Sequence, residues 1–265
     1  MKILVIGKNS TLAKVYKQKT KLKKIKYISH KELNRVNFKN YSHVINFAIN
    51  PKFKFEKYNS SLDIDDKITN EINTDTNYVM ISTRFVYYHN KDIPFSETHK
   101  CKPMNFYGVN KLKIENKLKK KIKNNLLILR LGTLLNFDLS KKHLFTSFLL
   151  NKLKKEKIVV IDLRKKIFKD FFTDDFFVKN LDILIRKKII GTYNLSSGIP
   201  LNPKNVASEI IKGYGKGRII FKFKNKADKS YLLNNEKLFS ITKLKIDKQK
   251  LLNYSYRLGK KLKYA

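Results

Sequence analysis

Three things are scarce in this sequence: cysteine, long hydrophobic runs and acidic residues. The single cysteine, Cys101, excludes a disulfide framework and a zinc site built from cysteines, and we expect it to be an inert loop residue. No apolar run approaches the roughly 20 residues of a transmembrane helix. The apolar stretch that opens the chain is interrupted by Gly7 and Lys8 too early for a signal peptide. We therefore expect a soluble, cytoplasmic protein without a membrane span.

The scarcity of acidic residues gives the chain a strong positive charge. It has 59 lysines and arginines against 21 acidic residues, a formal net charge of +38 and a pI near 10.1. Such a charge is typical of proteins that bind nucleic acid or anionic membranes. However, only seven of the basic residues are arginine, the usual bidentate ligand of phosphate, and lysine is spread along the whole chain. We interpret the charge mainly as solvated lysine surface that binds nucleic acid weakly and non-specifically at most. A polyanionic partner is the alternative.

Short apolar segments alternate with helix-forming segments over the first half of the chain. We expect strands at residues 2–6, 25–29, 43–48, 78–82 and 126–130, and helices at residues 11–20, 55–73 and 104–124. This alternation is typical of a parallel sheet with helices on both faces. The 265 residues, 42% of them apolar, suffice for one large domain with a smaller lobe.

The pattern changes after about residue 137. We expect helices at residues 141–155, 174–187 and 203–213, strands at residues 157–161, 191–195 and 218–223, and a helical C-terminus. No repeat or flexible linker separates the two halves. The predicted architecture is therefore a Rossmann-like α/β domain over residues 1–137 and a small mixed α/β lobe over residues 138–265. The two are expected to pack closely and to share strands or helices.

The turn after the first strand could bind a dinucleotide. A dinucleotide-binding fold has a glycine-rich turn here, followed by a helix whose N-terminal N–H groups bind the pyrophosphate. Gly7 stands at the first glycine position, but Ser10 and Ala13 replace the second and third glycines. A plain strand-turn-helix remains an equally good interpretation of this loop alone.

A tyrosine and a lysine in the long helix at residues 104–124 could move a proton. Tyr107 and Lys111 are four residues apart and therefore share a helix face. An ammonium group beside a phenol stabilises the phenolate, which makes the tyrosine a usable proton donor and acceptor. Three other tyrosines have a lysine four residues on, but only Tyr107 opens a long helix and follows a strand that ends in hydroxyl residues, Ser82 and Thr83. Such a hydroxyl can bond the same carbonyl oxygen as the tyrosine.

These segments, taken in order, resemble the extended short-chain dehydrogenase/reductase family of the epimerase/dehydratase type. The nearest branch is that of the nucleotide-sugar reductases that includes dTDP-4-dehydrorhamnose reductase. The specific match runs through residues 82–86, 94–97, Pro103, residues 107–111 and Glu115. Weaker similarity extends over Asn46, Ala48, Asn59, Arg130 and residues 171–176 and 191–198.

The resemblance implies an NAD(P)-dependent oxidoreductase that acts on a nucleotide-activated sugar, most simply a 4-keto-sugar reductase of surface polysaccharide or deoxysugar biosynthesis. It implies catalytic roles for Thr83, Tyr107 and Lys111. The residues that it implies for cofactor binding are Gly7, Asn9, Ser10, Thr11, Leu12, His30, Lys31, Asn46, Ala48, Asn59, Ser82, Tyr107 and Lys111. A 4-epimerase with tightly bound NAD, a non-catalytic NAD(P)-binding sensor or scaffold, and a homodimer remain open.

Two departures from the family pattern limit the expected reaction and the expected cofactor. Arg84 and Phe85 follow Thr83, where dehydratases of the family have an acid pair, so elimination of water is not expected. No acid stands directly at the end of the second strand, where Ser29, His30 and Lys31 follow. Because an acid there would hold the ribose hydroxyls of NAD, we expect a preference for NADP. The histidines show no metal-ligand spacing, and no metal is expected.

Overall fold

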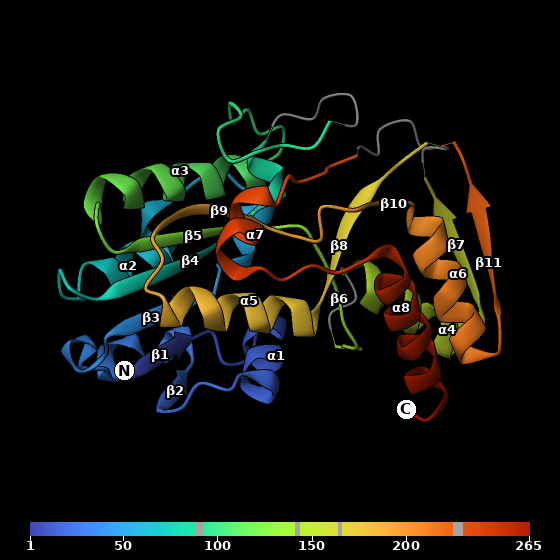
Figure 1. The fold of residues 1–265 in the computed structure, drawn as a ribbon, viewed down its shortest axis with the longest axis horizontal. Helices are drawn as coiled ribbons and strands as arrows, with labels where there is room; N and C mark the ends of the chain where they lie inside the picture. The colour runs from blue at the N-terminus through green and yellow to red at the C-terminus, as the bar shows by residue number, and fades with distance from the viewer. Residues whose placement is uncertain (88–92, 141–143, 164–165, 225–229) are drawn as a thin grey trace.

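The computed structural model describes residues 1–87, 93–140, 144–163, 166–224 and 230–265. The chain forms a large body around a parallel sheet and a small body beside it (Figure 1). The large body contains β1 (Ile3–Ile6), α1 (Thr11–Lys19), β2 (Ile25–Ile28), β3 (His43–Asn46), α2 (Ile64–Thr69), β4 (Asn77–Thr83), α3 (Phe106–Lys121), β5 (Leu126–Leu131), α5 (Asp174–Arg186), β9 (Gly191–Leu195) and α7 (Glu236–Thr242). The remaining elements are β6 (Thr133–Leu135), α4 (Phe145–Glu156), β7 (Ile158–Asp162), β8 (Lys169–Thr173), β10 (Pro200–Leu201), α6 (Pro203–Tyr214), β11 (Arg218–Lys222) and α8 (Lys248–Lys263).

The large body is built on six parallel strands in the order β2-β1-β3-β4-β5-β9. The chain leaves β1 toward one edge of the sheet to form β2 and then crosses back to form β3 on the other side of β1. The carboxyl ends of β1 and β3 therefore flank a topological switch point, where open α/β sheets bind their ligands. The predicted Rossmann-like sheet is confirmed.

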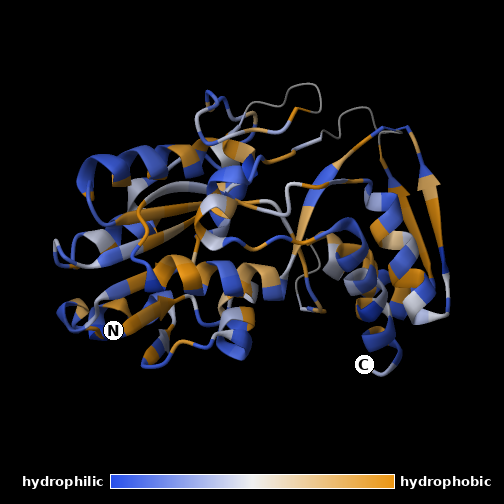
Figure 2. Ribbon diagram, in the orientation of Figure 1, coloured by the Kyte–Doolittle hydropathy of each residue, from blue (hydrophilic) through white to orange (hydrophobic). Residues whose placement is uncertain are grey.

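Side chains of the central strands alternate between two apolar layers. Ile3 and Val5 of β1 pack with α1, α5 and α7, while Leu4 and Ile6 pack on the opposite face with α2 and α3. Strands buried on both faces are continuous apolar runs, and Figure 2 shows the strands as the most hydrophobic part of the large body. Both faces of the sheet are therefore covered by helices.

One expectation about the element boundaries is wrong. The helix expected over residues 55–73 is reduced to α2, preceded by the 3-10 turns η3 (Pro51–Lys54) and η4 (Ser60–Leu62). Asn59 and Asp63 each accept a backbone N–H two or three residues on, and each such cap starts a new short helix. In addition, α5, β9 and α7 of the large body come from beyond residue 137. The large body therefore uses strands and helices from both predicted parts of the chain, and the boundary at residue 137 stays a prediction.

The small body depends on a close crossing of α6 and α8. A methyl group at Gly213 would lie 1.9 Å from the Tyr256 carbonyl oxygen, and one at Gly259 would lie 1.9 Å from the Ile210 carbonyl oxygen. Only glycine permits the two backbones to approach this closely. The C-terminal helix is thereby fixed against α6. Next to these helices, β11 and β7 form a two-stranded parallel ribbon, and β10-β8-β6 forms a small sheet nearer the large body (Figure 1).

Among the described residues, no helix combines the length and apolar composition needed to cross a membrane.

The buried His43 at the start of β3 predicts a loss of stability in acid. Burial and the positive charges of Lys188 and the N-terminus lower the pKa of His43 to about 4, whereas an unfolded histidine titrates near its ordinary value of about 6.5. Between these values the unfolded chain binds the additional proton, so the free energy of unfolding falls as pH falls from 6.5 to 4. The expected loss is about 3 kcal/mol.

Urea unfolding of the wild type and His43→Leu at pH 7 and pH 4 checks this prediction. The wild type is expected to lose about 3 kcal/mol more than the variant between these pH values. An equal loss in both proteins would show that His43 is not the titrating group.

Candidate active site

The start of α3 is pressed against the turn that follows β4. This turn is the 3-10 helix η5 (Arg84–Val86), and Thr83 caps it by accepting the Phe85 N–H at 3.3 Å. A methyl group at Gly108 would lie 2.1 Å from the Phe85 carbonyl oxygen, so only glycine allows this contact. The contact brings the strand end that carries Thr83 to the helix turn that carries Tyr107.

Tyr107 lies half-buried in this corner. Its ring meets the Phe85 ring edge to face, with 6.2 Å between centroids. Phe85 in turn meets Tyr231, at 5.1 Å between centroids. A residue from the C-terminal part of the chain thus belongs to the wall of the site, although no motif in that part of the sequence pointed to it.

Lys111 lies one turn further along α3 and is almost entirely buried, with 4% of its side chain exposed. Its Nζ is 4.0 Å from Oδ2 of Asp65 on α2. A buried ammonium group requires a counter-charge because the interior solvates it poorly. The structure therefore pairs the predicted catalytic lysine with an acid that the sequence analysis did not single out.

The Thr83 hydroxyl group is only partly hydrogen-bonded within the described chain. Its oxygen already accepts the Phe85 N–H, and within the described chain its O–H has no acceptor. A hydroxyl in this state donates to an oxygen placed beside it. Two side chains with hydroxyl groups, Thr83 and Tyr107, are thus carried by segments that touch each other at the carboxyl end of β4.

The turn after β1 is tight and leads directly into the N-terminus of α1. Gly7 has a φ of 90°, and a methyl group on it would lie 2.8 Å from the Ala48 nitrogen, so a glycine is required at the switch point. Ser10 caps α1 by accepting the Ala13 N–H. In the described part of the chain, the N–H groups of Thr11 and Leu12 donate to no protein acceptor. Free donors at a helix N-terminus attract an anion.

The predicted cofactor residues around this loop have different surroundings. Asn9 is exposed, and Leu12 packs on the hydrophobic core. The Thr11 hydroxyl donates to Asp138 at 2.7 Å, which connects the loop after β6 to the start of α1. The backbone of this turn is therefore the part available to phosphate, and the Thr11 hydroxyl is already bonded.

Three predicted cofactor residues have side chains that are hydrogen-bonded to other groups of the chain. Asn46 is buried, donates to Asp65 at 2.8 Å and accepts the Ala48 N–H at 2.9 Å. Ser82 is buried and donates to Glu115 at 2.5 Å. Asn59 is exposed and caps η4. For these three side chains the structure gives local structural roles, because each is already hydrogen-bonded within the chain.

The end of β2 carries two exposed basic residues and, one residue further on, an acid. His30 and Lys31 are exposed, as a basic site for a phosphate requires. An acid does lie close by: Glu32 accepts the Ser29 N–H at 2.6 Å and pairs with Lys8 at 2.8 Å. The contact with the Ser29 N–H, together with the Ser29 side-chain cap, forms a capping box at the start of η1 (His30–Arg35), and the ion pair with Lys8 adds a second contact. Glu32 is thus engaged in holding the turn.

Most of the family-like segments meet in one buried polar network behind the site. Arg130 donates to both oxygens of Glu115, at 2.6 Å for the shortest contact, and to the Tyr87 hydroxyl at 2.9 Å. Tyr87 donates to Asn194 at 2.8 Å, and the Asn194 amide donates to the Phe95 carbonyl at 2.7 Å. The network connects β4, α3, β5 and β9, so these motif residues hold the site in place.

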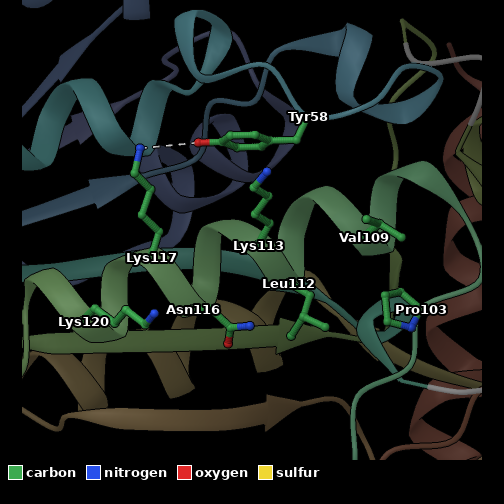
Figure 3. Close-up of a pocket in the computed structure, with 8 residues that line it drawn as sticks. All are labelled: Tyr58, Pro103, Val109, Leu112, Lys113, Asn116, Lys117 and Lys120. Carbon is green, nitrogen blue, oxygen red and sulfur yellow. Dashed lines mark hydrogen bonds between the residues drawn. The ribbon is translucent and has the colours of Figure 1, made fainter.

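A cavity of about 600 Å³ lies on the outer face of α3, lined by Tyr58, Pro103, Val109, Leu112, Lys113, Asn116, Lys117 and Lys120 (Figure 3). Neither Tyr107 nor Lys111 lines it, so we do not assign it to the candidate active site. Cys101 is a half-buried free thiol whose backbone pairs with that of Tyr87. Among the described residues, no group of three potential ligands is placed to hold a metal ion.

Comparison with known families identifies part of the chain. The sequence model of the RmlD substrate binding domain matches residues 68–168. This stretch contains Thr83, Tyr107 and Lys111, and the match confirms the resemblance predicted from these motifs. A search of curated proteins finds no match to the chain.

Solved structures share the fold over nearly the whole chain. RMD from Pseudomonas aeruginosa, complexed with NADPH, superposes with a TM-score of 0.79 at 13% identity, covering 98% of this chain and 99% of that one. A UDP-N-acetylglucosamine 4-epimerase from Methanobrevibacter ruminantium M1 gives 0.80 at 14% identity, covering 98% and 97%. The dTDP-4-dehydrorhamnose reductase from Yersinia enterocolitica gives 0.74 at 18% identity, covering 96% and 98%. These likenesses confirm the Rossmann-like fold.

The contact at Gly108 predicts a specific sensitivity to substitution. Gly108→Ala is expected to lower the free energy of unfolding by about 1–3 kcal/mol, because the new methyl group forces α3 away from the Phe85 carbonyl. The matched control is Val109→Ala, whose side chain is exposed on the outer face. Urea denaturation of both variants measures the difference. Equal stability of the two variants would contradict the close contact.

Proposed function

We propose that the chain is an NAD(P)-dependent oxidoreductase that reduces the 4-keto group of a nucleotide-activated sugar. The observation that carries the proposal is the corner made by Thr83, Tyr107 and Lys111 at the carboxyl edge of a Rossmann-like sheet. The solved structures of the same fold include a reductase of dTDP-4-dehydrorhamnose. Surface polysaccharide or deoxysugar synthesis is the expected context.

The residues around the switch point fit a dinucleotide. The unbonded N–H groups at the start of α1 would hold the pyrophosphate, and Gly7 lets the turn close against Ala48. The exposed His30 and Lys31 would face the adenosine ribose end, where their charge suits a 2′-phosphate. A bound nicotinamide would supply the hydride that reduces the sugar carbonyl.

The chain's own groups would handle the proton. Thr83 donates a hydrogen bond to the carbonyl oxygen and so polarises the carbonyl toward hydride attack. Tyr107 gives its proton to the same oxygen as negative charge develops there. The Lys111 ammonium binds the ribose of the cofactor and stabilises the phenolate left on Tyr107. No aspartate or glutamate is required in these steps, which agrees with Arg84 and Phe85 in the positions after Thr83.

Two alternatives use the same fold differently. A 4-epimerase would use the same three residues with tightly held NAD and no net oxidation. A non-catalytic NAD(P)-binding sensor or scaffold would need no proton relay. The Thr83 hydroxyl, which donates no hydrogen bond within the described chain, favours the catalytic interpretation over this alternative. The expectation of weak, salt-sensitive nucleic-acid binding by the lysine surface stays a prediction, as does a homodimer.

Removal of the Tyr107 hydroxyl is the direct test of the catalytic assignment. Tyr107→Phe is expected to lower kcat for a 4-keto sugar by about 10²–10⁴-fold, the usual contribution of a positioned proton donor. Cofactor affinity is expected to change little, because the ring and its contact with Phe85 remain. Steady-state kinetics and calorimetric titration measure the two effects.

The matched controls are Tyr27→Phe and Tyr256→Phe, which also have a lysine four residues on but lie outside the site. Both are expected to keep full activity. If Tyr107→Phe keeps more than about a tenth of the wild-type kcat, a loss far below that of a proton donor, the assignment is wrong.

The surroundings of β2 predict a preference for NADPH over NADH. The expected cause is the basic surface at His30 and Lys31 with no free acid at the strand end. Calorimetric titration of the wild type with both cofactors measures the preference.

The variant Glu32→Gln separates the two interpretations of the neighbouring acid. If Glu32 only closes the capping box, the variant leaves the affinities for NADH and NADPH in the same ratio as in the wild type, because a glutamine at this position also accepts the Ser29 N–H. A selective loss of NADH affinity in this variant, or tighter NADH binding by the wild type, would instead identify Glu32 as a ribose ligand.

A further inference from the structure

The buried carboxylate of Asp65 has its two oxygens in different roles. Oδ1 accepts the Tyr78 hydroxyl at 2.7 Å and the Asn46 amide at 2.8 Å. Oδ2 lies 4.0 Å from the Lys111 Nζ. Tyr78 is on β4 and Asn46 on β3, so two rigid strands fix the orientation of the carboxylate. Its remaining oxygen faces the lysine as a result.

This geometry makes Asp65 the counter-charge of Lys111. Each of the two side chains is only 4% exposed, so water screens neither charge. No other acidic oxygen of the described residues lies within 4.0 Å of the Lys111 Nζ. A lone buried ammonium group is costly and would move toward solvent or lose its proton. The ion pair therefore holds the charged lysine at one place in the fold.

We infer that Asp65 is a positioning residue for catalysis, which sets the place and charge of Lys111 beneath the cofactor ribose and Tyr107. The inference rests on the proposed function, since it assigns to Asp65 an effect on the Lys111 step of that reaction. Asp65 itself touches neither sugar nor cofactor in this scheme. It acts through the lysine alone.

A purely structural role for Asp65 is the competing explanation, and Asp63 provides a matched control for it. Asp63 is also fully buried, two residues earlier, and it accepts the Tyr58 hydroxyl at 2.7 Å and caps α2 through the Asp66 N–H at 3.1 Å. It forms no ion pair with Lys111. Asp63→Asn and Asp65→Asn therefore remove the same charge from the same short segment, and only the second uncouples the lysine.

The experiment compares kcat, sugar KM and the NADPH dissociation constant of the two variants. Asp65→Asn is expected to lower kcat by about tenfold to a hundredfold, as a displaced catalytic group does, and to weaken NADPH binding. The sugar KM is expected to stay unchanged. Asp63→Asn is expected to leave all three quantities within about twofold of wild type, as substitutions away from the reacting groups usually do.

A double variant distinguishes positioning from general damage. In a Lys111→Met background, Asp65→Asn is expected to cause no further loss of kcat or NADPH affinity, because the group through which it acts is gone. Additive losses would overturn the inference, as would an Asp65→Asn variant that matches Asp63→Asn. Should Asp65→Asn fail to fold, Tyr78→Phe loosens the carboxylate and keeps its charge. That variant is expected to lower kcat without changing the sugar KM, and an unchanged kcat would overturn the inference.

The proposed function and the role assigned to Asp65 can be refuted independently. A wild type that binds NADPH but reduces no 4-keto sugar refutes the proposed function. In that case the NADPH dissociation constants of the Asp65, Asp63 and Lys111 variants still decide the inference, because the lysine contact with the ribose precedes any reduction.

Discussion

The contact between Gly108 and the Phe85 carbonyl is the constraint on which the candidate active site depends. It fixes the start of α3 on the turn after β4, with Thr83 on one side and Tyr107 on the other. Two turns further along the helix, Glu115 binds Ser82 and Arg130 and fixes the same helix a second time. A helix held at two points against one strand end cannot slide or rotate, so Tyr107 and Lys111 keep their positions relative to Thr83.

The buried polar groups behind this corner are arranged for rigidity. The network from Ser82 through Glu115, Arg130 and Tyr87 to Asn194 contains charged groups that are almost fully buried, and each is satisfied by its neighbours. Breaking such a network leaves a buried charge without a partner, which costs far more than a surface ion pair. Several of the residues that give the chain its family resemblance therefore hold the segments of the candidate site in position.

Much of the large body could be predicted from sequence because its signals are local. The sequence shows clear apolar runs at β1, β4 and β5, and Gly7 marks the end of the first of them. Tyr107 and Lys111 have the spacing of one helical turn and follow a predicted strand. Asp65 and Tyr231 carry no such local pattern, since their positions depend on how distant segments pack. The close crossing of α6 and α8 at Gly213 and Gly259 also depends on how distant segments pack and has no local sequence pattern. The overlong helix at residues 55–73 failed because side-chain caps at Asn59 and Asp63 outweighed the apolar spacing.

The central claim is that this corner performs a net reduction, and one measurement addresses it most directly. The purified wild-type protein is mixed with NADPH and a panel of dTDP-, UDP- and GDP-linked 4-keto sugars. Oxidation of NADPH is followed by absorbance, and the sugar product by NMR. We expect one member of the panel to consume one equivalent of NADPH and to yield the corresponding 4-hydroxy sugar. Cofactor binding without NADPH oxidation by any member, or conversion of a sugar to its 4-epimer without net oxidation, would contradict the claim.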